Sequence, residues 1–247
     1  MFGISYIKTN EYAARMCERW RASQKGLHMA RLKPTMDPSG FTLLSDYVPQ
    51  IIQEIRYFST YNFLGERVDG YEEPCAIVTR EAARALKSAS NVFNVMGYRM
   101  KIFDAYRPVS AVNQFVFWAL EDVDVRMKPY FYPEIEKVEA IERGYIARRS
   151  SHSRGSTVDL TLLDMATGKE VDMGSPFDYF GELSHPDCRD VTDEQYENRM
   201  MLQRVMVRSG FEPIDCEWWH FTLVNEPYPE TYFEFPVSSA YLRRSRA

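Results

Sequence analysis

One stretch of the chain, residues 150–162, constrains the fold more than any other. Its sequence is SSHSRGSTVDLTL, in which a histidine and a glycine-containing turn precede an alternating run typical of a β-strand. In that run Val158, Leu160 and Leu162 point to one face and Asp159 points to the other. A carboxylate in a strand of core residues costs several kcal/mol unless a cation or hydrogen bonds compensate it. The stretch therefore predicts a buried strand that carries a compensated acidic side chain.

A metal ion is one cation that could compensate Asp159, because histidine and aspartate are both zinc ligands. A catalytic zinc site needs three protein ligands and one open position. The four histidines of the chain are His28, His152, His185 and His220. Of these, His220 lies in the run CEWWHFTLV, whose aromatic and β-branched residues indicate a second strand. His152, Asp159 and His220 are therefore the candidate metal ligands.

Glu217 lies three residues before His220, where the general base of a metallohydrolase could sit. On a regular strand, side chains three residues apart face opposite sides of the sheet. A β-bulge can re-aim a side chain. We therefore expect Glu217 at an irregular entry to this strand.

The pattern Ser-x-His-x-x-Gly-x-x-x-Asp followed by Glu-x-x-His resembles that of the zinc D-Ala-D-Ala peptidases. Residues 151–155 and 217–220 are similar to the corresponding pieces of the VanX-type D-alanyl-D-alanine dipeptidases, within the hedgehog-like metallopeptidases. Three further pieces occur in the same order: residues 57–65 with Tyr71, the segment DAYRP at 104–108, and the segment MGSPFD at 173–178. This resemblance extends from about residue 44 to 236. It implies hydrolysis of free D-Ala-D-Ala, or a close D,D-dipeptide, with one zinc ion per chain.

The chemistry of such a substrate suggests roles for the remaining polar residues. A free dipeptide carries an ammonium group, a carboxylate and one amide, whose hydrolysis develops an oxyanion. Arg107 suits the oxyanion, because a guanidinium stays charged and donates in a fixed fork. Asp178 suits the ammonium group, and Ser150 could assist there through its hydroxyl or carbonyl. The resemblance places Tyr57 and Tyr71 near the substrate carboxylate.

Each of these residues also has a plainer explanation. Arg107 could form a structural ion pair with Asp104. Asp178 could cap a helix or bond a loop, and Glu217 could be a charge at the rim of the site. A histidine such as His152, taken alone, is more often structural than a ligand. The joint pattern of ligands favours the metal site.

Composition excludes several classes of protein. The chain has 247 residues with 30 basic and 35 acidic side chains, and it lacks a basic block that would indicate nucleic-acid binding. It shows no export signal and no apolar run long enough to cross a bilayer. Its four cysteines do not form a disulfide pattern. We expect a cytoplasmic protein whose partner is a small dipeptide, without nucleic-acid or membrane partners. Association into a homo-oligomer is left open.

Patterning predicts the main elements of an α+β fold. Thr79 is the expected N-cap of a helix over residues 80–96, and Thr192 opens a capping box before a helix to Ser209. Strands and helices do not alternate as regular βαβ units, so we expect a mainly antiparallel central sheet flanked by helices. The expected organisation is an N-terminal extension of unknown role (1–43), a catalytic domain (44–236) and a disordered basic tail (237–247).

Two other functions remain compatible with the sequence. A D,D-carboxypeptidase, or another peptidase of peptidoglycan stem peptides, would use the same zinc site in an open cleft, usually with an export signal. A zinc-binding relative without activity would act as an interaction protein, although Glu217 and Arg107 argue against it. The biological role could be antibiotic resistance or the turnover of D-Ala-D-Ala.

Overall fold

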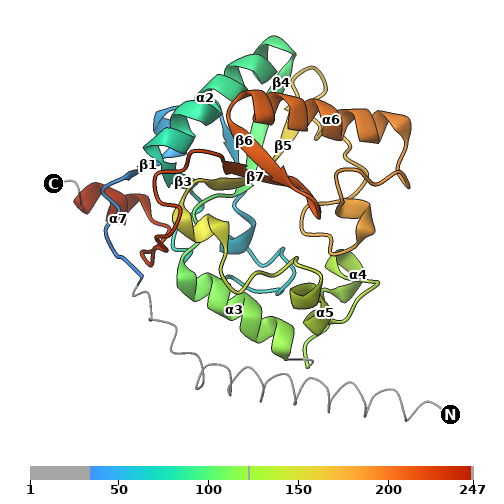
Figure 1. Cartoon of the computed structure of the whole chain (residues 1–247), viewed down its shortest axis with the longest axis horizontal. Coiled ribbons are helices and arrows are strands. Elements are labelled where there is room, and N and C mark those ends of the chain that lie inside the picture. Colours follow the sequence, from blue (N-terminus) through green and yellow to red (C-terminus); the bar gives the residue numbers. More distant parts are fainter. Residues whose placement is uncertain (1–33, 122, 246–247) are drawn as a thin grey trace.

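The computed structural model describes residues 34–121 and 123–245. A five-stranded sheet crosses this part of the chain in the order β2-β4-β5-β7-β6 (Figure 1). Its strands are β2 (Ile52–Gln53), β4 (Tyr98–Asp104), β5 (Thr157–Asp164), β6 (Phe211–Ile214) and β7 (Glu217–Leu223). β2 runs parallel to β4, and the other neighbouring pairs are antiparallel. The predicted α+β fold with a mainly antiparallel sheet is confirmed.

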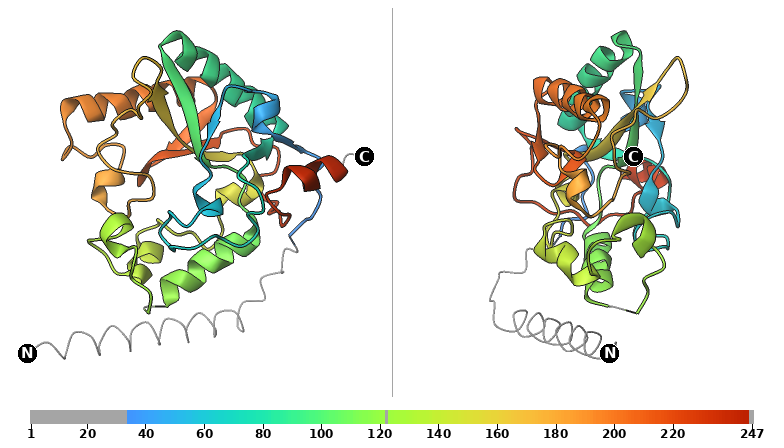
Figure 2. Two further views of the ribbon diagram at one scale, coloured as in Figure 1. Left: turned by 180° about the vertical axis from the view of Figure 1, so that it is seen from behind. Right: turned by 90° about the vertical axis from the view of Figure 1, so that its right-hand side faces the viewer.

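Helices lie on two sides of the molecule (Figures 1 and 2). On one side α2 (Arg80–Val95) packs on β4, α6 (Asp193–Arg208) packs on β6, and the two helices contact each other. On the other side α3 (Val109–Leu120) packs against α5 (Lys137–Glu142), beside the short α4 (Lys128–Phe131). Short 3₁₀ helices are η1 (Leu44–Asp46), η2 (Arg56–Phe58), η3 (Ser151–Arg154) and η4 (Glu182–Ser184). Within the described ranges, every helix is too short or too polar to cross a membrane.

Local sequence signals explain where the two long helices begin. The Thr79 hydroxyl accepts a hydrogen bond from the Ala82 amide at the start of α2, as predicted. Thr192 and Gln195 form a complete capping box at the start of α6, also as predicted. Gly97 follows α2 with a φ of +89°, a conformation that favours glycine. These ends depend only on neighbouring residues, which is why the sequence indicates them.

The two faces of β5 differ in the predicted way. Val158, Leu160 and Leu162 are completely buried in the hydrophobic core. Asp159 is also buried, but alternation along the strand turns it to the other face. The register pairs Asp159 with His220 of β7 and with Asp104 at the end of β4. The central strands thus bring three sequence-distant polar residues together.

The folded part begins earlier than residue 44. β1 (Phe41–Leu43) pairs with β3 (Ile77–Thr79), and Thr35 forms a bridge with Phe233. The Phe41 ring lies so close to Gly155 that a Cβ on this glycine would be 2.0 Å from the ring. The predicted boundary is therefore wrong, because aromatic packing between distant segments binds this segment to the domain. The rest of the expected extension, residues 1–33, lies outside the described residues.

The predicted disordered tail is also wrong for the described residues up to 245. α7 (Ser239–Arg244) follows the N-cap Ser238, and its Leu242 is buried. Glu73 accepts hydrogen bonds from the Ser238 and Ser239 hydroxyls. The arginines in this segment suggested a solvated tail, whereas these contacts with Glu73 hold it against the domain.

Candidate metal and active site

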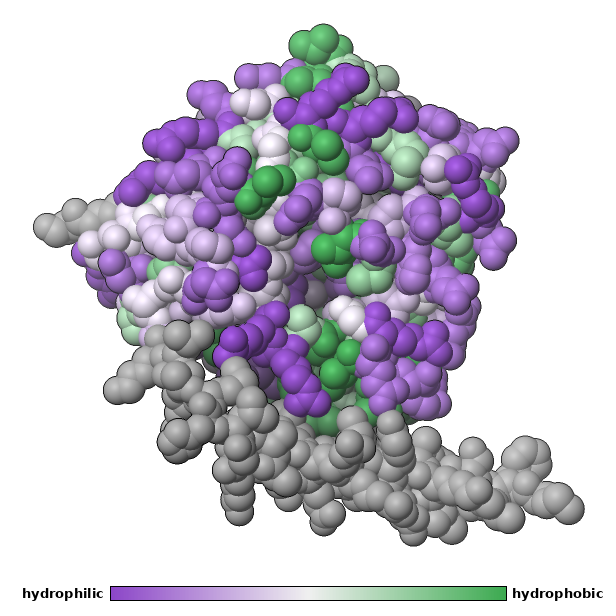
Figure 3. Space-filling view, in the orientation of Figure 1, coloured by the Kyte–Doolittle hydropathy of each residue, from purple (hydrophilic) through white to green (hydrophobic). Residues whose placement is uncertain are grey.

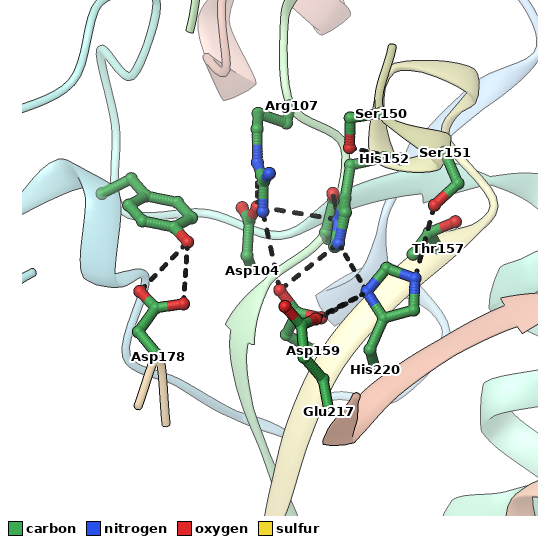
Figure 4. Close-up of polar contacts among 12 residues, drawn as sticks. Asp104, Arg107, Ser150, Ser151, His152, Thr157, Asp159, Asp178, Glu217 and His220 are labelled. Carbon is green, nitrogen blue, oxygen red and sulfur yellow. Dashed lines mark hydrogen bonds and ion pairs between the residues drawn. The ribbon is translucent and has the colours of Figure 1, made fainter. Parts of the chain in front are cut away.

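The three predicted metal ligands come from three adjacent elements. His152 lies in η3, Asp159 in β5 and His220 in β7 (Figure 4). The Ser150 hydroxyl accepts a hydrogen bond from the His152 amide and so caps the turn. Gly155 ends the turn with a φ of +83°, which lets the chain enter β5 directly. The turn and the strand register therefore place the three side chains at one point.

The potential ligand atoms converge closely. His152 Nε2 lies 3.3 Å from Asp159 Oδ2 and 3.3 Å from His220 Nδ1. His220 Nδ1 lies 3.1 Å from Asp159 Oδ1. That buried oxygen nevertheless has no partner with hydrogen-bond geometry. Two imidazole nitrogens and a carboxylate that converge in this way, with one carboxylate oxygen left without a partner, are suited to bind one metal ion.

The outer nitrogen of each histidine contacts another group. His152 Nδ1 lies 2.7 Å from the Ala105 carbonyl oxygen, to which it donates, so Nε2 keeps its lone pair for a metal. His220 Nε2 lies 3.4 Å from the Ser151 hydroxyl, so Nδ1 is the inward nitrogen. Burial lowers the pKa of His220, which favours the neutral imidazole that metals bind. Both rings are therefore oriented as metal ligands, with one nitrogen of each directed at the cluster.

Asp159 is held in its charged form. Burial alone would raise its pKa, but its interactions with His152 and His220 outweigh burial and keep the pKa below its usual range. A carboxylate that stays ionised at neutral pH is ready to bind a cation. The compensation that the sequence requires for Asp159 is thus supplied partly by the two histidines.

Glu217 lies beside the ligand cluster, at the start of β7. Its Oε2 is 3.5 Å from His220 Nδ1, although the two residues are three apart on a strand. The pairing of β6 with β7 shifts between Pro213 and Ile214, which confirms the predicted irregularity. Burial, and then the charges of Asp159 and Asp178, raises the pKa of Glu217 well above its usual value. This carboxylate therefore takes up a proton readily.

Arg107 follows β4 and reaches the same cluster. Its Nε donates to Asp104 Oδ2 at 2.9 Å, and its Nη2 lies 3.6 Å from Asp159 Oδ2. The guanidinium also lies over the rings of Tyr57 and Phe115, at 5.0 and 4.8 Å from their centroids. Arg107 therefore forms the ion pair with Asp104 and also lies at the site. One edge of its guanidinium binds Asp104, while another edge faces the ligand cluster.

The two predicted substrate tyrosines have different positions. The Tyr57 hydroxyl donates to Asp178, at 3.1 Å from each carboxylate oxygen. The Tyr71 hydroxyl donates to Asp104 at 2.7 Å and so supports the partner of Arg107. Tyr57 faces the cavity described below, whereas Tyr71 is not among the residues that line it. Asp104 thus orients Arg107 with the help of Tyr71.

The loop that carries Asp178 is anchored by an arginine that we did not single out from the sequence. Arg199 of α6 is buried and donates to the carbonyl oxygens of Met173, Leu183 and His185. Burial raises the pKa of Asp178 well above its usual value, and the charge of Asp159 adds to this effect. A buried carboxyl group on an anchored loop is well placed to recognise a cation.

A cavity of about 260 Å³ contains this cluster. Eight of the predicted site residues line it, namely Tyr57, Arg107, Ser150, His152, Asp159, Asp178, Glu217 and His220. Phe63, Phe115 and Phe180 supply an aromatic wall. The face shown in Figure 3 is hollowed near its centre. The cavity therefore contains three potential metal ligands, a potential base in Glu217, a cation in Arg107 and an acid in Asp178. Metal-assisted hydrolysis of an amide requires groups of these kinds.

Comparison with known proteins gives a consistent result. The family model described as D-Ala-D-Ala dipeptidase matches residues 37–238. The D-alanyl-D-alanine dipeptidase of Enterococcus faecalis is 43% identical over 200 residues, which cover 81% of this chain and 99% of that protein. Those of Enterococcus faecium and Streptomyces coelicolor are 42% and 40% identical, each over 80% of this chain and 98% of the relative. The chain therefore belongs to the D-Ala-D-Ala dipeptidase family, whose members are hydrolytic enzymes.

Proposed function

We propose that this protein is a zinc-dependent dipeptidase that hydrolyses free D-alanyl-D-alanine or a close D,D-dipeptide. Family membership supports the reaction class. The observation that carries the choice of a free dipeptide is Asp178, a buried carboxyl group that lines the same cavity as the metal ligands. Such a group recognises a free ammonium group close to the reacting amide. The expected cytoplasmic location forms part of this proposal.

His152, Asp159 and His220 would hold the zinc ion. In a tetrahedral site with bonds of about 2.0–2.2 Å, neighbouring ligand atoms lie roughly 3.3–3.6 Å apart. The separations of 3.1–3.3 Å between the inward atoms come close to this requirement. When bound, zinc polarises the substrate carbonyl and makes water more acidic.

Other residues of the cavity would bind the substrate, transfer the proton and stabilise the oxyanion. Asp178, oriented by Tyr57, binds the substrate ammonium group. Glu217 takes the proton of the attacking water and passes it to the leaving amine. Arg107 donates hydrogen bonds to the oxyanion as its charge develops. Asp104 holds Arg107 in position for this task.

The cavity favours this function over the two alternatives. A carboxypeptidase must accept a peptide chain that continues beyond the reacting residue, whereas here a buried carboxyl group, Asp178, and the aromatic wall line a cavity of about 260 Å³ around the cluster. A non-catalytic zinc-binding protein would have no use for a buried glutamate next to the ligands. Glu217 is 8% exposed and lines the cavity with Arg107, so its burial is costly without a function.

Substrate selectivity tests the proposal. D-Ala-D-Ala should be cleaved, whereas kcat/KM should fall by about two orders of magnitude or more for N-acetyl-D-Ala-D-Ala and for a pentapeptide ending in D-Ala-D-Ala. Loss of one partner from a buried charge pair costs about 3–5 kcal/mol, and the low end corresponds to this factor. Steady-state hydrolysis assays with the three substrates measure the ratio.

Asp178→Ala provides the matched variant for that assay. In this variant the difference in kcat/KM between the free dipeptide and the other two substrates should become smaller, chiefly because the free dipeptide reacts more slowly. Comparable wild-type rates on the dipeptide and the pentapeptide would favour the carboxypeptidase alternative and leave Asp178 a structural residue of its loop.

Zinc content tests the ligand assignment. The wild-type protein should hold one zinc ion per chain after dialysis against a micromolar concentration of chelator, and His220→Ala should lose it, because two ligands bind far more weakly than three. Elemental analysis measures the ratio of zinc to protein. His185→Ala is the control, since His185 bonds Tyr145 outside the cluster and its loss should leave the zinc in place. Full retention of zinc by His220→Ala would refute the assignment.

A further inference from the structure

Two of the three arginines that line the cavity are already paired with carboxylates. Arg107 is paired with Asp104 and Asp159. Arg154 directs its fork at Glu226, with Nε 2.8 Å and Nη2 2.7 Å from Oε1. A guanidinium engaged in such a fork has little remaining capacity for a second carboxylate. Arg154 is therefore not free to bind an additional carboxylate, and the donors of Arg107 that do not bind Asp104 face the ligand cluster, where the oxyanion develops.

Arg149 is the third arginine of the cavity, and its charge is available. Across residues 34–121 and 123–245, no ion pair joins Arg149 to a carboxylate. Its guanidinium lies 5.7 Å from the centroid of the Tyr232 ring. The side chain is exposed to solvent while it borders the cavity. An aromatic face supports the guanidinium and leaves its donors free.

Arg149 and Asp178 both line the cavity that contains the ligand cluster. Figure 4 shows Asp178 on one side of the ligand cluster and Ser150 with Ser151 on the other. Arg149 directly precedes Ser150 in the chain. A dipeptide with its ammonium group at Asp178 and its amide at the cluster therefore extends its carboxylate toward this second side. An unpaired cation borders the cavity there.

We propose that Arg149 binds the C-terminal carboxylate of the dipeptide and sets a preference for substrates with a free C-terminus. The inference deepens the proposed function and rests on it. A guanidinium and a carboxylate form two parallel hydrogen bonds, which fix orientation as well as charge. Asp178 and Arg149 together would recognise the two opposite charges of a free dipeptide, so that each end excludes longer peptides.

The test compares two substrates that differ only in the charge recognised by Arg149. Wild-type protein should have a much lower KM for D-Ala-D-Ala than for D-alanyl-D-alaninamide. In Arg149→Gln the KM for the acid should rise about 10- to 100-fold, the range of charge-assisted hydrogen bonds to a ligand, while the KM for the amide stays within about twofold. Arg149→Lys should keep part of the preference, because it keeps the charge without the fork. The preference should also weaken as salt is added.

Arg148→Gln is the matched control. Arg148 is exposed and adjacent to Arg149, but it is not among the residues that line the cavity. The two variants have the same net charge, so a general effect of charge would appear in both. Equal values of KM for the acid in Arg149→Gln and Arg148→Gln would overturn the inference.

A binding measurement makes the test independent of turnover. Calorimetric titration of the zinc-loaded Glu217→Gln protein with D-Ala-D-Ala and with its amide reports affinity without cleavage. The acid should bind more tightly, and the difference should vanish in Glu217→Gln/Arg149→Gln. If the acid shows this preference but wild type does not cleave it, the proposed function fails and the inference stands. If wild type cleaves the acid and both proteins bind acid and amide equally, the inference alone fails.

Discussion

Replacing Glu217 with glutamine is expected to lower kcat for D-Ala-D-Ala by about 10²–10⁴-fold, the usual effect of removing a general base. Glutamine has nearly the same shape as glutamate but cannot accept the proton of the attacking water. The carboxylate lies 3.5 Å from His220 Nδ1, close enough to serve a water molecule held at the cluster. Burial raises its pKa, which favours the protonated form that then delivers the proton to the leaving amine.

The same variant separates a base from a ligand. Glu217→Gln should retain the full zinc content, because His152, Asp159 and His220 are all intact. Its thermal stability should not fall, since a buried acidic group close to Asp159 and Asp178 is replaced by an amide of similar shape that cannot ionise. Elemental analysis and thermal unfolding check the two expectations. Loss of zinc together with activity would make Glu217 a fourth ligand.

Arg107→Lys is expected to reduce kcat about 10²–10³-fold with a much smaller rise in KM. Loss of one donor to a developing oxyanion has an effect of this size. Lysine keeps the positive charge but cannot bind Asp104 with one edge of a planar fork and direct another toward the cluster, as the arginine does. An interaction made mainly in the transition state lowers kcat and kcat/KM together.

Steady-state kinetics with D-Ala-D-Ala measure this division. If KM rises strongly while kcat is unchanged, Arg107 instead binds the substrate in the ground state. The group that it binds could then be the C-terminal carboxylate of the dipeptide, which we assign to Arg149. Asp104→Asn is a useful companion variant, because it leaves Arg107 in place and removes the charge that orients it. Asp104→Asn should lower kcat by a smaller factor than Arg107→Lys does, and it should retain zinc.

Several elements could be predicted because their causes are local. The alternation of Val158, Leu160 and Leu162 requires Asp159 to face the other side of β5, and this holds in the structure. The N-cap of α2 depends on Thr79 and the amide three residues later. The spacing of Glu217 and His220 requires an irregular strand if both side chains are to meet, and the register of β6 and β7 shifts there. Periodicity and hydrogen-bond capacity are sufficient for such predictions.

Other features depend on which distant segments meet. Phe41 lies 4.7 and 5.0 Å, between ring centroids, from Phe233 and Phe235, and nothing in the local sequence around residue 41 indicates this contact. The burial of Arg199 could be inferred in part from the sequence, because helical spacing places it on the same side of α6 as Leu202 and Met206, which are buried. Its three carbonyl partners, however, lie 14 to 26 residues away along the chain.

The sequence by itself determined the buried acidic strand, the candidate ligands and the capped helices, because each follows from neighbouring residues and their periodicity. Only the tertiary structure decided how the charges of the site are shared. Tyr71 bonds Asp104 instead of facing the cavity, and Asp104 in turn binds Arg107. Arg154 is paired with Glu226, whereas Arg149 has no carboxylate partner in the described part of the chain. Electrostatic interactions depend on distances between side chains, and these distances are set only when the strands and loops pack together.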